Sequence, residues 1–194
     1  MVRIYIVRPG STEFDEQGRI KGTLDIPLSQ YGSGQVNRTA NELVQQGIEV
    51  VYAAPCQSAE ETAALLAEKL GTRQKTLSKL TNLDHGLWQG KLIEDVKEKQ
   101  PKVYRQWQEQ PETVCPPEGE MLEHARQRVH ASLDRLIKKH KNGCIAIVLP
   151  EPLASLAQCY LERGNLGDLW QAETECGTWV QLDFHPEAFA TDVK

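Results

Sequence analysis

The sequence predicts an α/β protein with three layers, in which helices cover both faces of a mainly parallel sheet. Two observations support this fold class and its organisation as one domain. Short apolar runs typical of buried strands alternate along the chain with longer stretches whose apolar residues recur at helical spacing. The chain also lacks an internal repeat, a linker or a low-complexity tract, so residues 1–194 are expected to form a single domain.

The N-terminal region predicts a strand, a helix and a second strand. Residues 2–7 form an apolar run typical of a buried strand. Ser29 can cap a helix whose apolar residues lie on one face, and Gly47 is placed to end it. The apolar residues 48–54 then predict the second buried strand.

The middle of the chain predicts another helix, a strand and a helical insertion. A capping-box pattern begins at Ser58 and opens a helix that Gly71 ends. Residues 75–80 form a third predicted strand. Residues 91–115 are polar with a few aromatic residues, and their first twenty residues predict one or two short helices.

The C-terminal region predicts the longest helix and two further strands. Residues 120–140 carry one apolar stripe at helical spacing, which predicts a long amphipathic helix. Residues 144–149 form the most strand-like run of this half, and residues 152–164 predict a helix. Residues 178–184 alternate in polarity, as a last strand would.

Composition excludes several classes of function. The net charge of −5 and the isoelectric point near 5.6 argue against a nucleic-acid surface, which would be basic. Apolar runs are too short to span a membrane, and the N-terminus lacks the apolar region of a signal peptide. Without a Cys-x-x-Cys pair, the cysteines predict reduced thiols in a cytoplasmic protein rather than a metal site. They are Cys56, Cys115, Cys144, Cys159 and Cys176.

The stretch with the strongest functional signal follows the first predicted strand. Residues 8–12 read Arg-Pro-Gly-Ser-Thr, which places a cation and a tight turn at the carboxyl edge of the sheet, where α/β proteins bind ligands. Residues 18–22 then read Gly-Arg-Ile-Lys-Gly, and residues 25–29 read Asp-Ile-Pro-Leu-Ser. This ordered series resembles the opening of the histidine phosphatase superfamily, which includes the cofactor-dependent phosphoglycerate mutases. The resemblance implies a phosphoglycerate mutase-like fold, with residues 91–115 as a lid over the pocket.

The resemblance also identifies catalytic positions, and four of them carry unsuitable residues. Pro9 falls on the nucleophilic histidine, and proline cannot be phosphorylated by that chemistry. Ser58 replaces the phosphate-binding arginine and cannot supply its charged fork. Asn82 replaces the acidic proton donor, and Pro150 replaces the second histidine. Of the five core groups only Arg8 remains.

These replacements predict a catalytically inactive homologue, a pseudoenzyme with a binding, scaffolding or regulatory role. Two alternatives stay open. One is a residual phosphatase acting on a small phosphorylated metabolite, and the other is a weak sensor of phosphate-type anions. A protein partner is conceivable, although nothing in the sequence identifies one. No cofactor, metal, nucleic acid or membrane is expected.

The rest of the implied pocket is expected to be a degenerate phosphate site. Its members are Arg8, Ser11, Thr12, Asp15, Arg19, Lys21, Ser58, Asn82 and Glu151. Glu151 lies between two prolines at the start of a predicted helix, where a carboxylate is favoured. Two interpretations of this residue are open: it pairs with Arg8 inside the pocket, or it caps the helix and faces water. For Ser58 a helix-capping role is favoured over ligand binding.

Two other residues could carry replacement chemistry. His85 lies beside Asp84 in a segment that forms part of the site in the family, although a packing role is favoured. Cys56 lies near a predicted helix N-terminus, although a small apolar role is favoured there as well. The remaining histidines are expected on the long helix or on the surface: His124, His130, His140 and His185.

Overall fold

The computed structural model describes residues 1–184 and contains one five-stranded sheet with the strand order β3-β2-β4-β1-β5. Four strands are parallel, and β5 runs antiparallel to β1 at the edge. The mainly parallel sheet of the predicted fold class is therefore confirmed. The strands are β1 (Val2–Val7), β2 (Val50–Ala53), β3 (Arg73–Thr76), β4 (Cys144–Val148) and β5 (Trp179–Phe184).

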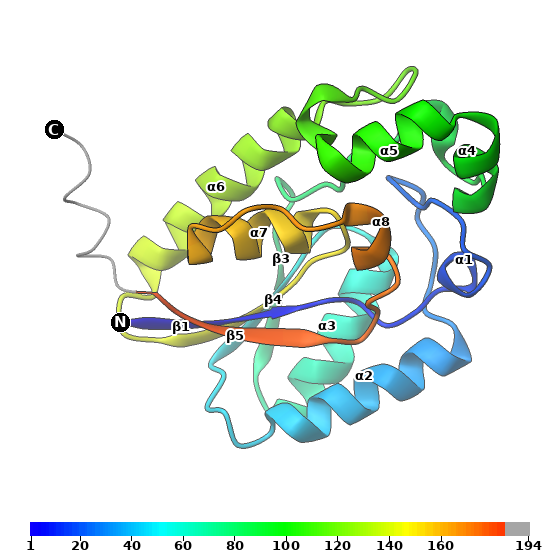
Figure 1. The fold of residues 1–194 in the computed structure, drawn as a ribbon. Helices are drawn as coiled ribbons and strands as arrows, with labels where there is room; N and C mark the ends of the chain where they lie inside the picture. Colours follow the sequence, from blue (N-terminus) through cyan, green and yellow to red (C-terminus); the bar gives the residue numbers. More distant parts are fainter. Residues whose placement is uncertain (185–194) are drawn as a thin grey trace, which may run out of the picture.

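Helices cover both faces of the sheet, as the alternating pattern predicts (Figure 1). One face is covered by α2 (Gln30–Leu43) and α3 (Gln57–Leu70), and the other by α6 (Leu122–Lys139) and α7 (Leu153–Glu162). The short helices gather where β1 ends. They are α1 (Glu13–Glu16), α4 (Ile93–Lys99), α5 (Pro101–Glu109) and α8 (Leu169–Ala172), with the 3-10 turns η1 (Gly86–Trp88) and η2 (Pro111–Thr113).

The topology creates a ligand-binding position between β1 and β4. These strands are neighbours, with Val7 opposite Val148 at their carboxyl ends. The chain leaves β1 toward α2 on one face and leaves β4 toward α7 on the opposite face (Figure 1). The two outgoing loops therefore diverge, and the crevice between them is the usual binding position of open α/β sheets. Arg8 and Glu151 stand in these two loops.

Several predicted elements are confirmed, with shifts at their ends. The stripe of α6 is buried throughout: Leu122, Ala125, Val129, Leu133, Leu136 and Ile137. Ser29 caps α2 by accepting the Gly32 amide, and Gly71 ends α3 in the left-handed conformation. By contrast, α2 stops at Leu43 and leaves Val44 exposed. The third strand lies at residues 73–76 rather than 75–80 and is mostly exposed at the sheet edge.

The predicted capping role of Ser58 is wrong. Helix α3 begins at Gln57, and Cys56 holds the capping position without a side-chain hydrogen bond to the helix. Ser58 is therefore already inside the first turn, where its hydroxyl lies 3.9 Å from the Cys56 sulfur. The helix therefore starts two residues earlier than the capping-box pattern predicts, and helix ends are the part of an element that a local pattern defines least well.

Two helices, α4 and α5, occupy the predicted helical insertion. Trp107 of α5 is fully buried against Trp88 and Trp170, with ring centroids 6.2 and 6.1 Å away. The Trp170 indole also donates to the Tyr104 carbonyl at 3.1 Å, which joins α8 to α5. No helix within residues 1–184 is both long and apolar enough to cross a membrane.

Two glycines allow the loop after β1 to lie directly on α2. A methyl group on Gly32 would stand 2.0 Å from the Ser11 carbonyl oxygen, and one on Gly10 would stand 2.4 Å from the Gly32 carbonyl oxygen. Both neighbouring atoms belong to the backbone, so a side-chain rotation cannot relieve the clash and the backbone itself would have to move. This close approach fixes the loop that carries Arg8.

We expect Gly32→Ala to destabilise the protein, because the loop after β1 must move away from α2. A loss of about 2 kcal/mol or more is expected from overpacking at a backbone contact. Gly34→Ala is the matched control, since it lies in the same helix with nothing within 4 Å of the added carbon. The free energy of unfolding of that control should rise by about 0.5–1 kcal/mol, because alanine favours a helix more than glycine does. Urea unfolding of both variants measures the difference, and equal stabilities would contradict the close-contact role.

Candidate functional site

A buried ion pair joins the two loops at the carboxyl edge of the sheet. Arg8 Nε donates to Glu151 Oε1 at 2.6 Å, and the side chains are 9% and 5% exposed. The backbone N–H of Arg8 donates to the Thr178 carbonyl at 2.8 Å. A second carboxylate, Glu175, lies 3.6 Å from Arg8 and is half exposed. Since an unpaired buried charge is costly, Glu151 and Arg8 hold each other in place.

Glu151 combines the two roles that were weighed as alternatives. Its Oε1 pairs with Arg8, while its Oε2 accepts the backbone N–H of Ser155 at 3.2 Å in the first turn of α7. The residue is 6% exposed, so the interpretation that it faces water is wrong. The helix N-terminus and the cation both stabilise the same carboxylate.

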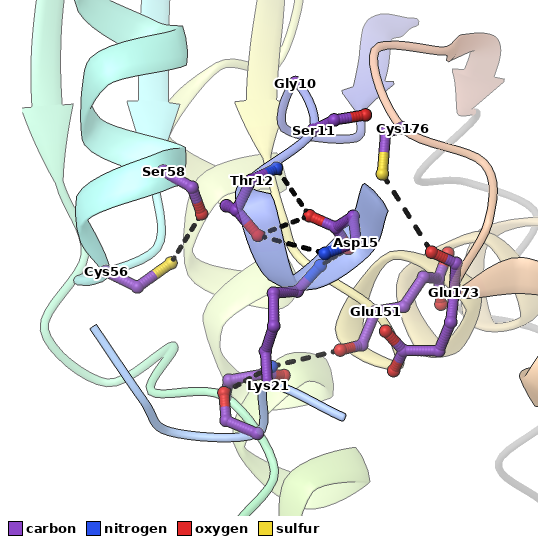
Figure 2. Close-up of polar contacts among 12 residues, drawn as sticks. Gly10, Ser11, Thr12, Asp15, Lys21, Cys56, Ser58, Glu151, Glu173 and Cys176 are labelled. Atoms are coloured by element: carbon purple, nitrogen blue, oxygen red, sulfur yellow. Dashed lines mark hydrogen bonds and ion pairs between the residues drawn. The ribbon is translucent and has the colours of Figure 1, made fainter. Parts of the chain in front are cut away.

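A second ion pair lies beside the first. Lys21 contacts the carboxylate of Asp15, and Asp15 Oδ2 also accepts the backbone N–H of Thr12 at 2.7 Å (Figure 2). Thr12 in turn caps α1 by accepting the Asp15 N–H at 3.3 Å. This reciprocal arrangement is a capping box, which fixes Asp15 next to the loop that carries Arg8.

The segment after α8 completes the site, and the sequence did not indicate it. Glu173 and Cys176 lie beside Lys21 and Glu151 in one cavity (Figure 2). Burial, with the negative charges of Glu151 and Asp15, raises the pKa of Glu173 to about 8 against the attraction of Lys21. Glu173 is therefore largely protonated at neutral pH. Burial also raises the pKa of Cys176, to about 11, so its thiol is not a nucleophile there.

Charge balance explains the protonation of Glu173. Arg8 and Lys21 are the two cations, and they face four carboxyl groups, those of Asp15, Glu151, Glu173 and Glu175. Burial alone would lower the pKa of Lys21, but Glu173, once ionised, and the Asp15 carboxylate raise it, so the amine keeps its charge. The cavity between these groups has a volume of about 20 Å³. That is room for about one water molecule, so a phosphate ester enters only if the walls move.

The remaining members of the predicted pocket divide into two groups. Ser58, Pro9 and Pro150 line the cavity, whereas Ser11 directs its N–H and hydroxyl to Gln35 Oε1, both at 2.9 Å. Arg19 is used elsewhere: its guanidinium donates to the Gly90 carbonyl at 2.7 Å.

Asn82 connects the site to the chain around it. Its side-chain N–H groups donate to the carbonyls of Gly22 and Glu151, each at 3.0 Å. It thereby ties the loop after Lys21 to the residue that pairs with Arg8. The Asn82 side chain lies at the edge of the cluster and does not line the small cavity.

The structure gives His85 a packing role. His85 is 2% exposed and stacks among Trp88 and Trp107, with ring centroids 6.5 and 5.5 Å away. Neither ring nitrogen has a hydrogen-bond partner among residues 1–184, and burial lowers its pKa to about 4. Burial likewise raises the pKa of Cys56, so its thiol is not activated. The part of the chain that is described contains no group of three acidic, histidine or cysteine residues arranged to hold a metal ion.

His185 lies outside the described residues. The other three histidines, His124, His130 and His140, lie on or directly after α6, which the sequence predicted. His130 stacks on Tyr160 with ring centroids 4.1 Å apart, and His140 contacts the Tyr52 hydroxyl at 2.9 Å. None of the three lines the cavity.

Comparison with known proteins identifies the family. Residues 4–193 match the model of the histidine phosphatase superfamily, branch 1. The chain belongs to this superfamily. The resemblance inferred from residues 8–29 is therefore confirmed for the family and for the fold.

Several relatives and structural neighbours of this superfamily member carry the names of phosphatases. Phosphoserine phosphatase 1 of Hydrogenobacter thermophilus is 32% identical over 88% of this chain and 81% of its own length. A bifunctional protein of Mycobacterium tuberculosis is 28% identical over 95% of this chain, which spans 51% of that protein. Two solved structures share the fold. A mycobacterial glucosyl-3-phosphoglycerate phosphatase has a TM-score of 0.82, 21% identity, and coverage of 95% of this chain and 92% of its own. The alpha-ribazole phosphatase of Shigella flexneri has a TM-score of 0.80, 22% identity, and coverage of 95% and 92%.

The name of the first of these relatives contradicts the prediction that the protein is not an enzyme. That relative, 32% identical to this chain over most of both lengths, is named a phosphatase. The prediction weighed only the residues that fall on the family's catalytic positions. It took no account of Glu173, because the resemblance is weak beyond residue 165.

We expect Glu151→Ala to destabilise this superfamily member strongly, because it leaves Arg8 buried without its closest partner. Removing one side of a buried ion pair costs about 3 kcal/mol or more. Asp183→Ala is the control: it removes an exposed ion pair with Arg3, 38% exposed on each side, and should cost less than about 1 kcal/mol. Denaturant unfolding of the three proteins tests the contrast. A loss for Glu151→Ala as small as the control's would show that the pair is not energetically important.

We expect His85 to make stability depend on pH in the acid range. Its pKa is about 4 when folded and 6.5 in the unfolded chain, so the unfolded state binds the proton first as the pH falls. Between these two values the protein should lose about 3 kcal/mol of stability from this group. The free energy of unfolding at pH 7 and pH 4 measures it in wild type and in His85→Leu, with His124→Leu as the exposed control. If His85→Leu keeps the full acid loss, the assignment is wrong.

Proposed function

We propose that this protein is a phosphomonoesterase for a small phosphorylated metabolite, with water rather than histidine as the nucleophile. The phosphatase names of its relatives support the reaction class. The observation that carries the proposal is the meeting of two cations with two unlike carboxyl groups at the crevice between β1 and β4. Pro9 and Pro150 leave no imidazole in the positions that the resemblance assigns to the phosphohistidine route.

The cations suit the phosphoryl group. Arg8 can present its planar guanidinium to two phosphoryl oxygens, and Lys21 adds a point charge. In this scheme the phosphate dianion displaces Glu151 from Arg8. The Ser155 N–H still holds the other oxygen of Glu151, so the freed carboxylate stays beside the phosphorus.

The two carboxyl groups then take opposite roles in proton transfer. Glu151 accepts a proton from water as the water oxygen bonds to phosphorus. The phosphorus–oxygen bond of the ester breaks, and the leaving oxygen keeps the electron pair and takes the proton of Glu173. The products are an alcohol and inorganic phosphate. Protonated Glu173 and ion-paired Glu151 meet the requirement for an acid and a base whose environments differ.

Entry of the substrate requires a change in shape. The cavity of about 20 Å³ is closed on one side by Ala172, Glu173, Glu175 and Cys176. Helix α8 is anchored by its buried Trp170, whose indole donates to the Tyr104 carbonyl at 3.1 Å. The segment that follows it, residues 173–176, is half-buried or exposed. Withdrawal of this segment would open the crevice toward the α4–α5 insertion, which would then act as the lid.

The test is hydrolysis of para-nitrophenyl phosphate and a panel of phosphorylated metabolites. Arg8→Ala should lower kcat/KM by about 10²-fold or more, because it removes the main phosphoryl contact. Glu173→Gln should lower kcat by about 10²-fold or more, because an amide cannot donate the proton. In wild type kcat/KM should fall as the pH rises above about 8, where Glu173 loses its proton, and Glu173→Gln should lose this limb.

Arg126→Ala is the matched control, since it removes an exposed cation paired with Glu123 on α6. It should keep wild-type activity. Intact mass after quenching in alkaline denaturant, in which a phosphohistidine survives, should show no phosphorylated protein during turnover. Activity that survives unchanged in Arg8→Ala would identify a contaminant, and absence of turnover across the panel would refute the proposal.

A further inference from the structure

A second and much larger cleft lies on the other side of Asn82. It runs between α6 and the chain from Ser78 to Asp84, and its volume is about 780 Å³. That volume lies within the range of small-molecule sites, unlike the cavity of about 20 Å³ beside Arg8. Its lining residues are Thr23, Ser78, Lys79, Thr81, Asn82, Asp84, Glu120, His124, Gln127, Arg128, Ala131, Ser132 and Arg135.

The cleft has two cations available for a ligand. The charge of Arg128 is already paired, since its terminal guanidinium nitrogens contact both oxygens of Glu120 and one donates to the Thr81 carbonyl at 3.1 Å. Lys79 and Arg135 are exposed, and neither forms an ion pair with any residue in 1–184. They stand on opposite walls, one on the chain after β3 and one on α6. In a chain of net charge −5, two such cations in one concave surface favour an anion there.

The base of the cleft holds polar atoms that lack partners. Asn82 is 5% exposed, and its Oδ1 accepts no hydrogen bond from the described residues. Its orientation is determined, because both N–H groups donate to carbonyl oxygens, those of Gly22 and Glu151. Arg128 Nε is likewise buried without an acceptor in the described part of the chain. Unpaired buried donors and acceptors are costly, so a ligand hydroxyl that joins them is favoured.

We propose that this cleft binds a small phosphate monoester that carries at least one hydroxyl group. The doubly charged phosphate lies between Lys79 and Arg135, and the hydroxyl reaches toward Asn82 and Arg128. This site does not depend on the proposed hydrolysis and adds to it a separate binding position. Asn82 links the two, because the same amide that borders the cleft donates to the Glu151 carbonyl.

The test is calorimetric titration with glycerol 3-phosphate at low ionic strength, with glycerol and inorganic phosphate as separate probes. The experiment uses the full chain carrying Glu173→Gln, so that the probe is not consumed. The double variant Lys79→Ala/Arg135→Ala should bind glycerol 3-phosphate at least 10-fold more weakly. The matched control is Lys69→Ala/Lys138→Ala, which removes two exposed lysines outside the cleft and should bind as before. Glycerol 3-phosphate should bind more tightly than either glycerol or inorganic phosphate.

Arg8→Ala separates the cleft from the candidate hydrolytic site. If binding persists in Arg8→Ala and falls in the cleft variant, the ligand lies in the cleft, whether or not the protein hydrolyses phosphate esters. If Arg8→Ala loses binding while the cleft variant binds as tightly as before, the ligand lies beside Glu151 and the proposal is overturned. Equal weakening in the lysine control would show general attraction by surface charge, and absence of binding would overturn the proposal too. If Arg8→Ala does not fold, Arg8→Lys takes its place.

Discussion

The ion pair between Arg8 and Glu151 is the constraint on which this structure depends. Both charges lie at the point where the chain leaves neighbouring parallel strands toward opposite faces of the sheet. Neither can be buried alone, so each loop requires the other. In the first turn of α7, the backbone N–H of Ser155 also donates to Glu151. The loop after β1, which carries Arg8, is held against α2 by the close contact of Gly10 and Gly32.

The same pair determines the electrostatics around it. With Arg8 neutralised by Glu151 and Lys21 by Asp15, a further buried carboxyl group has no cation of its own. Glu173 responds by keeping its proton near neutral pH. A single site thus contains the ion-paired carboxylates Glu151 and Asp15 beside the carboxylic acid Glu173. Glu151 and Glu173 have the same side chain, so the difference in protonation arises from their surroundings: Glu151 is paired with Arg8, whereas no cation is left for Glu173.

The protein illustrates how a fold is kept while its site changes. The glycines, the Asp-Ile-Pro-Leu-Ser segment and the parallel sheet maintain the framework of the histidine phosphatase superfamily. Four positions no longer carry the catalytic residues of the family, yet each of them is buried: Pro9, Ser58, Asn82 and Pro150. Asn82 has gained a structural role, since it joins the loop after Lys21 to Glu151 and separates the small cavity from the large cleft. Packing conserves the scaffold, and the chemistry depends on which side chains face the crevice.

The sequence by itself determined the fold class, the family and the long elements. Apolar periodicity is strong in β1, β4 and α6, because each buries a continuous face, and these elements end within one or two residues of the prediction. The family could likewise be identified from one short stretch of the chain, the ordered motifs in residues 8–29. The sequence also indicated that Arg8 and Glu151 could meet, since both follow predicted parallel strands.

Only the tertiary structure decided what fills the site. Glu173 and Cys176 are brought in by α8, a helix of four residues without usable periodicity, from a part of the chain about 150 residues beyond Lys21 in sequence. The placement of Ser58 inside its helix and of Arg19 on Gly90 depends on packing between distant segments. Burial and charge pairing are properties of the assembled chain. The protonation of Glu173, the packing role of His85 and the cleft beside α6 could therefore be seen only once the fold had brought their neighbours together.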